Sequence, residues 1–578
     1  MSYLSIFAKT GEFLLISFRF LNKEKLYPWY VFLFFLAFFT LLYMTLDQVF
    51  SLDDGFFHIR FAELLREKGL AAFTDFQSIY FSRMSIGQEY LVYYNFLFYL
   101  VLLPFTFIIP LVVGMKLYGV IALTVSFTAV YAFLRKVSVR YSFLWMLLFL
   151  IVLLQSGWLF RFTLARPFTL TPVFLVVMLF FIHQKRYRFS ALVAFLYFFW
   201  HTATFFFPLA FAFGYFLFEQ FYGKKPDWKM IMMPLLGTLV ALFAAYLISP
   251  GVIAYLRDVI FPVFFDTALT KGTGIVEGNE VYGRDIFSTV TALFWFVATL
   301  FVVGAYEILR YIRMKRGIQE AEERIDMSMQ PLRAVLFMAS LVFLGATTLS
   351  GRFLDYFVYF CLLYIAIAVT DVGKFIEIRG VAFKQALRFG TLLAGLYLLI
   401  SLSLGFYNSL AEAQSHLFVA APAEWLNTNV ESGKIIFNVD WSAFPTFYYF
   451  TGDRFRYATG LEPRFLYDLS PQLYWVWNNI GGGIACTESD CSELAQEREQ
   501  ALSHEDSKQG WYAEQGNLIA DVILQDFKTD IVVTSINRKD LLAVMDNSKR
   551  FKKEYFDDKN STYAVYRIVA TDESEIKK

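Results

Sequence analysis

Two adjacent carboxylates and a histidine follow the first long apolar run of the chain, in the segment Leu52-Asp53-Asp54-Gly55-Phe56-Phe57-His58-Ile59-Arg60. Asp54 and His58 are four residues apart, so on a helix they lie on the same face. If the preceding run crosses the membrane, this face lies at the outer membrane surface. A carboxylate and an imidazole at that place are suited to acid/base chemistry or cation binding on a lipid-borne substrate.

Further ionisable side chains recur at the predicted outer ends of later apolar runs, namely Arg161, Arg166, His201, Glu277, Glu280 and Arg352. Each has a simpler interpretation when taken alone. Asp53 and Asp54 can cap a helix, the arginines can lie in solvated loops or reach lipid headgroups, and His201 can be an ordinary interfacial histidine. Their joint placement on one side favours a site in which the arginines and the two histidines, His58 and His201, bind the substrate.

The composition is typical of a membrane protein with many spans. Of the 578 residues, 57% are hydrophobic and 20% aromatic, with a mean hydropathy of +0.50, against about 45–50% apolar residues in soluble domains. The formal net charge of +1 gives no basic bias that would indicate nucleic acid. Cys486 and Cys491 can pair outside the cytoplasm or remain free thiols, whereas Cys361 falls within an apolar run.

The distribution of Lys and Arg between apolar runs predicts the topology. Residues 1–27 are expected to form a cytoplasmic interfacial amphipathic helix, and residues 88–110 an outer interfacial helix. About eleven crossings result from hydropathy and the positive-inside rule. The predicted spans lie near residues 28–46, 111–134, 141–157, 168–183, 189–204, 205–222, 230–249, 286–309, 334–349, 353–371 and 389–408, with outer loops at 47–110, 157–167 and 250–285.

The remaining residues, 409–578, are predicted to form an extracytoplasmic α/β domain. Residues 434–439, 530–534 and 562–568 have strand character, and residues 518–527 and 537–546 have helical periodicity. Residues 487–509 are polar and are expected to form a loop or an exposed helix. The predicted fold is therefore a polytopic α-helical membrane domain, residues 28–408, followed by this α/β domain.

The segment Leu52–Arg60 resembles the first acidic motif of GT-C glycosyltransferases, and is most similar to that of the catalytic subunit of oligosaccharyltransferase. Asp54 matches the motif's aspartate. Two later segments resemble the same subunit, Ser350-Gly351-Arg352-Phe353-Leu354-Asp355-Tyr356-Phe357 and Ala423-Glu424-Trp425-Leu426. The resemblance implies that Glu277 and Glu280 lie in a loop that faces the acidic site. It therefore suggests Asp53, Asp54 and Glu280 as catalytic carboxylates, with Asp54 and Glu277 as ligands of Mg²⁺ or Mn²⁺.

The chain departs from the family pattern at two places. The WWDYG motif, which reads the acceptor sequon, is replaced by Asn438-Val439-Asp440-Trp441-Ser442-Ala443-Phe444-Pro445. The second acidic motif is replaced by Arg161-Phe162-Thr163-Leu164-Ala165-Arg166-Pro167. These changes weigh against transfer to asparagine in proteins and against a tightly held divalent metal.

Sugar transfer from a polyprenyl phosphate or diphosphate needs a base for the acceptor hydroxyl and positive charge for the leaving phosphate. Asp54 can supply the first, and Arg161, Arg166, Arg352 or a metal the second, with inversion at the sugar. The acceptor can be a glycan, a lipid or a protein, and the expected location is a bacterial inner (plasma) membrane. Two alternatives are a non-catalytic scaffold and a transporter of lipid-linked glycans, although the internal repeats typical of transporters are not seen.

The topology leads to a direct test. Reporter fusions should place the loops at Arg135, Lys185, Lys224, Lys315 and Lys384 in the cytoplasm and the tail beyond residue 408 outside. The reason is that Lys and Arg in short loops are retained on the cytoplasmic side. A tail reporter that is active only in the cytoplasm would contradict both the topology and a site on the outer face.

Overall fold

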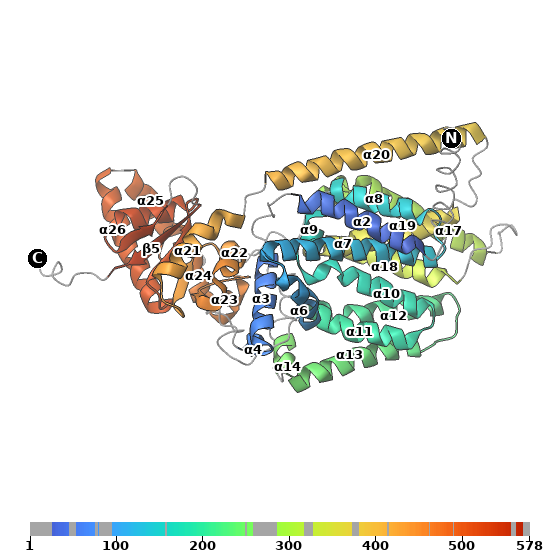
Figure 1. Cartoon of the computed structure of the whole chain (residues 1–578), viewed down its shortest axis with the longest axis horizontal. Helices are drawn as coiled ribbons and strands as arrows, with labels where there is room; N and C mark the ends of the chain where they lie inside the picture. Colours follow the sequence, from blue (N-terminus) through green and yellow to red (C-terminus); the bar gives the residue numbers. More distant parts are fainter. Residues whose placement is uncertain are drawn as a thin grey trace, which may run out of the picture.

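The computed structural model describes residues 26–45, 54–74, 79, 95–155, 159–248, 251–257, 286–316, 328–372, 381–412, 416–461, 463–488, 491–503, 505–556 and 562–569. Within these residues the chain forms a bundle of helices followed by a smaller domain built on a β-sheet (Figure 1). Helix α3 lies between the bundle and the C-terminal domain (Figure 1). The expected helix at the N-terminus and residues 258–285 of the long outer loop lie outside the described residues.

The long helices of the bundle follow the predicted spans in order. They are α2 (Tyr27–Phe39, continued by the π-helix η2, Thr40–Met44), α7 (Leu111–Lys136), α8 (Ser142–Gln155), α10 (Thr171–His183), α11 (Tyr187–Trp200), α12 (Phe207–Phe221), α13 (Lys229–Ile248), α17 (Phe294–Lys315), α18 (Gln330–Ala346), α19 (Phe353–Val372) and α20 (Val381–Ala411). Shorter elements connect them: α3 (Asp54–Lys68), α4 (Ala71–Thr74), α6 (Phe96–Leu102), η3 (Leu103–Phe107), α9 (Leu159–Thr163), η4 (Pro167–Thr169), η5 (Thr202–Thr204), α14 (Val252–Tyr255) and α16 (Ile286–Ala292).

The helices support a membrane protein, although they do not establish the predicted number of spans. Among the described residues, six helices are long and apolar enough to cross a membrane: Tyr27–Met44, Leu111–Lys136, Thr202–Phe221, Lys229–Ile248, Phe294–Arg313 and Phe353–Thr370. Five other predicted spans correspond to shorter apolar helices, Ser142–Gln155, Pro167–His183, Tyr187–Trp200, Gln330–Ala346 and Gly395–Ala411. A total of about eleven crossings therefore stays a prediction.

The C-terminal domain contains a five-stranded sheet with the strand order β2-β1-β3-β5-β4. Strand β1 pairs in parallel with β2 and β3, and β5 pairs antiparallel with β3 and β4. The strands are β1 (Ile435–Asn438), β2 (Arg456–Tyr457), β3 (Ile531–Ser535), β4 (Phe551–Tyr555) and β5 (Tyr563–Ile568). The mixed sheet confirms that the tail is an α/β domain.

Helices cover both faces of this sheet. Neighbouring residues of β1 point to opposite sides, so that Ile436 packs with α21 (Ala420–Asn429) and α22 (Phe444–Thr451). Phe437 packs on the other side with α24 (Pro471–Ile480), α26 (Glu505–Asp526) and α27 (Lys539–Asn547). The domain is completed by η8 (His416–Val419), η9 (Trp441–Ala443), η10 (Gly452–Arg454), α23 (Arg464–Leu469) and α25 (Ser492–Leu502).

The local predictions for this domain are confirmed in most places. The three predicted strands correspond to β1, β3 and β5, and the two predicted helices to the end of α26 and to α27. The polar stretch 487–509 contains the exposed helix α25. Helix α20 ends at Ala411, three residues after the predicted boundary at residue 408.

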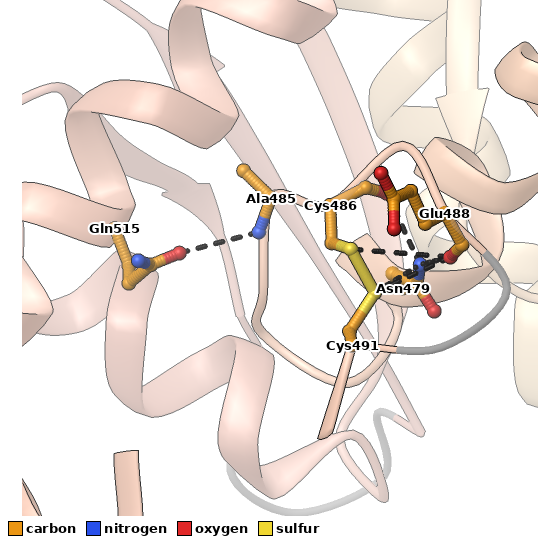
Figure 2. The surroundings of a disulfide bond; sticks show 6 residues. All are labelled: Asn479, Ala485, Cys486, Glu488, Cys491 and Gln515. Carbon is orange, nitrogen blue, oxygen red and sulfur yellow. Dashed lines mark hydrogen bonds between the residues drawn. A yellow bond between two sulfur atoms is a disulfide. The ribbon is translucent and has the colours of Figure 1, made fainter. Parts of the chain in front are cut away.

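A disulfide closes a short loop after α24. Cys486 and Cys491 are bonded, so the paired alternative holds in this structure (Figure 2). The side-chain amide of Asn479 donates hydrogen bonds to the carbonyl oxygens of Cys486 and Glu488, at 3.1 and 2.9 Å. Gln515 of α26 accepts a hydrogen bond from the backbone N–H of Ala485 at 3.2 Å (Figure 2). The loop is therefore fixed to both neighbouring helices.

Within the bundle, α11 and α13 approach closely because Gly237 has no side chain. A Cβ at this position would lie 2.1 Å from the carbonyl oxygen of Ala191. Backbone oxygen cannot rotate away as the end of a long side chain can, so a larger residue has to push the two helices apart. Small residues at helix contacts are the usual way in which membrane helices come close together.

The substitution Gly237→Ala should therefore destabilise the protein by about 1–3 kcal/mol, the usual cost of overpacking. The matched control is Gly214→Ala in α12, where a Cβ would meet nothing within 4 Å. That change should be neutral or stabilising, by up to about 1 kcal/mol of helix propensity. Thermal unfolding of the two purified variants tests the difference, and equal melting temperatures would contradict the close packing at Gly237.

Candidate functional site

The predicted acidic segment begins a helix, as its sequence indicates. Asp54 is the first residue of α3, where the positive end of the helix dipole favours a carboxylate. His58 follows one turn later on the same helix. Most of the apolar residues between Gly55 and Leu65 are buried, so α3 is packed against its neighbours over most of its length. Asp54 therefore has a position that is determined by a packed helix.

Arg166 pairs with Asp54. An Arg166 guanidinium nitrogen lies 2.9 Å from a carboxylate oxygen of Asp54, and the side chains are 12% and 30% exposed. A charge-assisted contact at this distance joins two segments that are far apart in the sequence. Of the three arginines predicted to converge near Asp54, Arg166 therefore contacts it directly.

His58 is a neutral member of this group. Its Nδ1 lies 2.9 Å from the hydroxyl of Tyr99, and its ring packs edge-on against Phe98. Burial, and then the nearby positive charge of Arg166, lower the pKa of His58 to about 3. The imidazole is therefore uncharged at neutral pH. It can donate or accept a hydrogen bond, but it does not supply positive charge for a phosphate.

Arg161 has a different partner from the one that the sequence suggested. Its Nε and Nη2 lie 3.0 to 3.3 Å from the carboxylate oxygens of Asp355, and both side chains are buried. This is a bidentate ion pair between α9 and α19, and it neutralises the charge of Arg161 within the protein. Arg161 therefore acts first as a structural residue of the site.

The two arginines share one aromatic ring. The guanidinium carbons of Arg161 and Arg166 lie 5.2 and 5.9 Å from the centroid of Phe168. Both distances are within the range of a cation–π contact. Phe168 thus links the buried pair Arg161–Asp355 to the partly exposed pair Arg166–Asp54.

Arg352 and His201 form a second group. Burial, and then the charge of Arg352, lower the pKa of His201 to about 3. The Nδ1 of His201 lies 2.8 Å from the hydroxyl of Thr204, which lies 2.7 Å from that of Tyr197. Arg352 is half-buried just before α19. The two histidines are therefore alike, each neutral beside an arginine.

The predicted carboxylates Asp53, Glu277 and Glu280 lie outside the described residues. Within the part of the chain that the structure describes, no group of three or more His, Cys, Asp or Glu side chains can hold a metal ion. Asp54, the described member of the predicted Mg²⁺ or Mn²⁺ site, is paired with Arg166. The metal site stays a prediction.

Asp355 and Lys116 are among the buried charges that were not predicted from the sequence. Asp355 lies in the segment 350–357, but the sequence did not indicate that it pairs with Arg161. Lys116 is buried in α7, with its ammonium nitrogen 5.0 Å from the centroid of the Tyr43 ring. Each is a single charged residue within an apolar run. Such residues are costly inside a membrane unless they have a role, so this pattern could have indicated both.

An apolar groove ends close to this group. It has a volume of about 320 Å³ and is lined by Leu97, Val101, Phe105, Tyr118, Ile121, Ala122, Val125, Leu170, Phe174 and Trp200. Trp200 donates a hydrogen bond to the carbonyl oxygen of Pro167, the residue after Arg166. Phe98 contacts Trp200 on one side and His58 on the other, with ring centroids 5.8 and 5.2 Å apart. A single ring thus separates the groove from His58.

The buried pair leads to a stability prediction. Asp355→Asn leaves the charge of Arg161 buried beside a neutral amide, which should cost about 3–5 kcal/mol. Replacing both residues, as Arg161→Met with Asp355→Leu, removes the charge and should recover most of that loss. Thermal unfolding of the single and double variants is the measurement. A double variant no more stable than Asp355→Asn alone would show that the pair is not what stabilises this contact.

Neither a scan against protein-family models nor a search of curated proteins found a match to this chain. The resemblance to GT-C glycosyltransferases therefore rests on the segments quoted from the sequence. What the protein does has to be argued from the chemistry of the residues around Asp54.

Proposed function

We propose that this protein is a membrane glycosyltransferase that moves a sugar from a polyprenyl-phosphate or polyprenyl-diphosphate donor to an acceptor hydroxyl on the outer face. The observation that carries the proposal is the pair of Asp54 and Arg166, 2.9 Å apart at the start of α3. It brings together a partly exposed carboxylate and a guanidinium group, the two kinds of group that such a transfer requires.

In the proposed reaction, the acceptor oxygen attacks the anomeric carbon of the sugar and loses its proton to the carboxylate of Asp54. The bond from that carbon to the phosphate oxygen breaks, and its electron pair leaves with the phosphate. Attack from the side opposite the phosphate inverts the anomeric centre. Arg166 stabilises the developing negative charge, because a phosphate placed beside it can share the guanidinium with Asp54.

Arg352 is proposed to contribute a second positive charge to the phosphate. Arg161 is proposed to act indirectly, since its charge is neutralised by Asp355. Through Phe168, which both guanidinium groups approach, the buried pair holds Arg166 toward Asp54. His58 and His201 are neutral, so they are proposed to orient polar groups of the substrate rather than to neutralise its phosphate.

The apolar groove supports a lipid-linked donor. Two of its lining residues, Val101 and Val125, are more than a third exposed at the surface of the bundle. Val125 lies in the middle part of α7, one of the helices that are long and apolar enough to cross a membrane. The groove thus extends from the exposed surface of the bundle at Val101 and Val125 to Trp200. A hydrocarbon chain in the groove would bring the attached phosphate toward Arg166.

The disulfide supports a location of the C-terminal domain outside the cytoplasm. Cys486 and Cys491 are bonded, and such bonds persist in oxidising compartments, whereas thiols in the cytosol are kept reduced. This is consistent with the predicted topology, in which the tail follows the last span on the outer side. The acceptor is accordingly proposed to be an extracytoplasmic glycan, lipid or protein.

The decisive variant is Asp54→Asn. It keeps the shape of the side chain and an oxygen at the start of α3, so folding should change little, yet it removes the proton acceptor. Loss of a positioned general base should lower the transfer rate by about 10²- to 10⁴-fold. The rate is measured with purified protein in lipid nanodiscs and defined polyprenyl-linked sugars, with mass spectrometry of the product.

The matched control is Glu67→Gln, which removes an exposed carboxylate from the same helix without touching Asp54. Its transfer rate should stay within about 2-fold of that of the unmodified protein, as expected for a change at a solvated ion pair. If Asp54→Asn transferred sugar at the unmodified rate, Asp54 would be a helix cap and not the base. Absence of product from the unmodified protein with every donor would favour the non-catalytic scaffold.

A further inference from the structure

The C-terminal domain reaches across to the helix that carries Asp54. Helix α22 packs alongside α3, with the ring of Phe57 lying 5.3 Å from that of Tyr448 and 6.1 Å from that of Phe444. The ring of Phe56 lies edge-on to Tyr449 at 5.2 Å. These contacts involve the residues that follow directly after Asp54. Figure 1 shows α22 at the edge of the C-terminal domain that faces α3.

Polar contacts attach the same segment at further points. The hydroxyl of Tyr449 accepts a hydrogen bond of 3.2 Å from the backbone N–H of Val112, at the start of α7. Asp453 forms an ion pair with Lys68, the last residue of α3. Outside this segment, Ile79 pairs in parallel with Tyr457 of strand β2. The segment 444–453 therefore contacts both ends of α3 and one end of α7.

Gly452 is the point of closest approach. Its φ of +59° lies in the left-handed region, which side chains other than glycine rarely adopt. A Cβ there would lie 2.7 Å from the guanidinium nitrogen Nη2 of Arg60. Arg60 in turn forms an ion pair with Glu63 on α3. A side chain at position 452 would thus strain the corner of the domain and displace the Arg60 guanidinium from its ion pair with Glu63 on α3.

We propose that segment 444–453 of the C-terminal domain positions α3, and thereby sets the place of Asp54 in the reaction. This inference rests on the proposed function of Asp54. The segment has no direct contact with the reacting atoms in this proposal, so its residues are positioning residues.

Because α3 is long, a small tilt of the helix moves Asp54 by a large distance. The helix has 15 residues, which corresponds to a length of about 22 Å. A tilt of about 5° around its far end would therefore move Asp54 by about 2 Å. A misplacement of about 1 Å at a reacting group can lower a rate by about 10²-fold. Packing against α22 restricts such a tilt, because the contacts lie along the helix rather than at one end.

The main test compares Gly452→Ala with Gly433→Ala. Gly433 also has a left-handed φ, +82°, and lies in the same domain, but a Cβ there would meet nothing within 4 Å. Both variants place an alanine at a positive φ, and only Gly452→Ala brings a Cβ against a side chain of α3, the Arg60 guanidinium. We expect Gly452→Ala to lower kcat at least about 10-fold, within the range for a misplaced reacting group, with little change in the KM for donor. Gly433→Ala should keep kcat within about 2-fold of the unmodified value, since its strain does not reach α3.

A second readout does not depend on sugar transfer. Hydrogen exchange of the backbone amides of α3 should be faster in Gly452→Ala than in Gly433→Ala, because a less tightly held helix opens more often. Equal exchange and equal kcat in the two variants would overturn the proposal. If the unmodified protein transfers no sugar, the proposed function fails, whereas a difference in exchange alone would still show that the segment holds α3.

A milder pair of variants covers the case in which Gly452→Ala does not fold. Tyr449→Phe keeps the ring against Phe56 and removes the hydroxyl that binds the N–H of Val112. Its control is Tyr467→Phe, whose ring packs against Tyr474 on the other side of the sheet. Only Tyr449→Phe should show faster exchange in α3 and a lower kcat. We expect kcat to fall by about 3-fold or more, as for a shift of Asp54 smaller than 1 Å. The same behaviour in both tyrosine variants would overturn the positioning role.

Discussion

Charged groups at the ends of apolar helices have to be neutralised inside the protein, and the region around Asp54 is organised by this constraint. Both side chains of the Arg161–Asp355 ion pair are buried. Removal of an isolated charge from water costs several kcal/mol, so each partner depends on the other. Phe168 then couples this pair to Arg166, which approaches Asp54. The two ion pairs tie α9, α19 and α3 together where the polar residues gather.

Much of the fold could be predicted from local patterns. The order of the long helices followed from hydropathy, and β1, β3 and β5 from short apolar runs, because burial on both sides of a sheet leaves a clear signal. Strand β4 was missed, since its sequence Phe-Lys-Lys-Glu-Tyr has the charges that commonly protect an edge strand. The number of crossings does not follow from hydropathy alone, because several of the apolar helices are shorter than a membrane span usually requires.

The candidate site could be predicted only in part. Asp54 and His58 share a helix, as their spacing indicates, and Arg166 lies beside Asp54 as its position at an outer loop suggested. The pairing of Arg161 with Asp355 joins residues 194 positions apart, and no local pattern reports such a contact. The neutral state of His58 could not be predicted from the sequence either, because it depends on burial by Phe98 and Tyr99 from another part of the chain.

The state of the three cysteines has a practical consequence. Two of them are joined in the disulfide near Asn479, and Cys361, the third, is fully buried in α19. Thiol reagents act on exposed, unbonded cysteines. The natural chain should therefore react little with spin labels and fluorescent maleimides. A pair of cysteines introduced at the surface, one in each domain, can report the distance between the two domains without prior removal of the native ones.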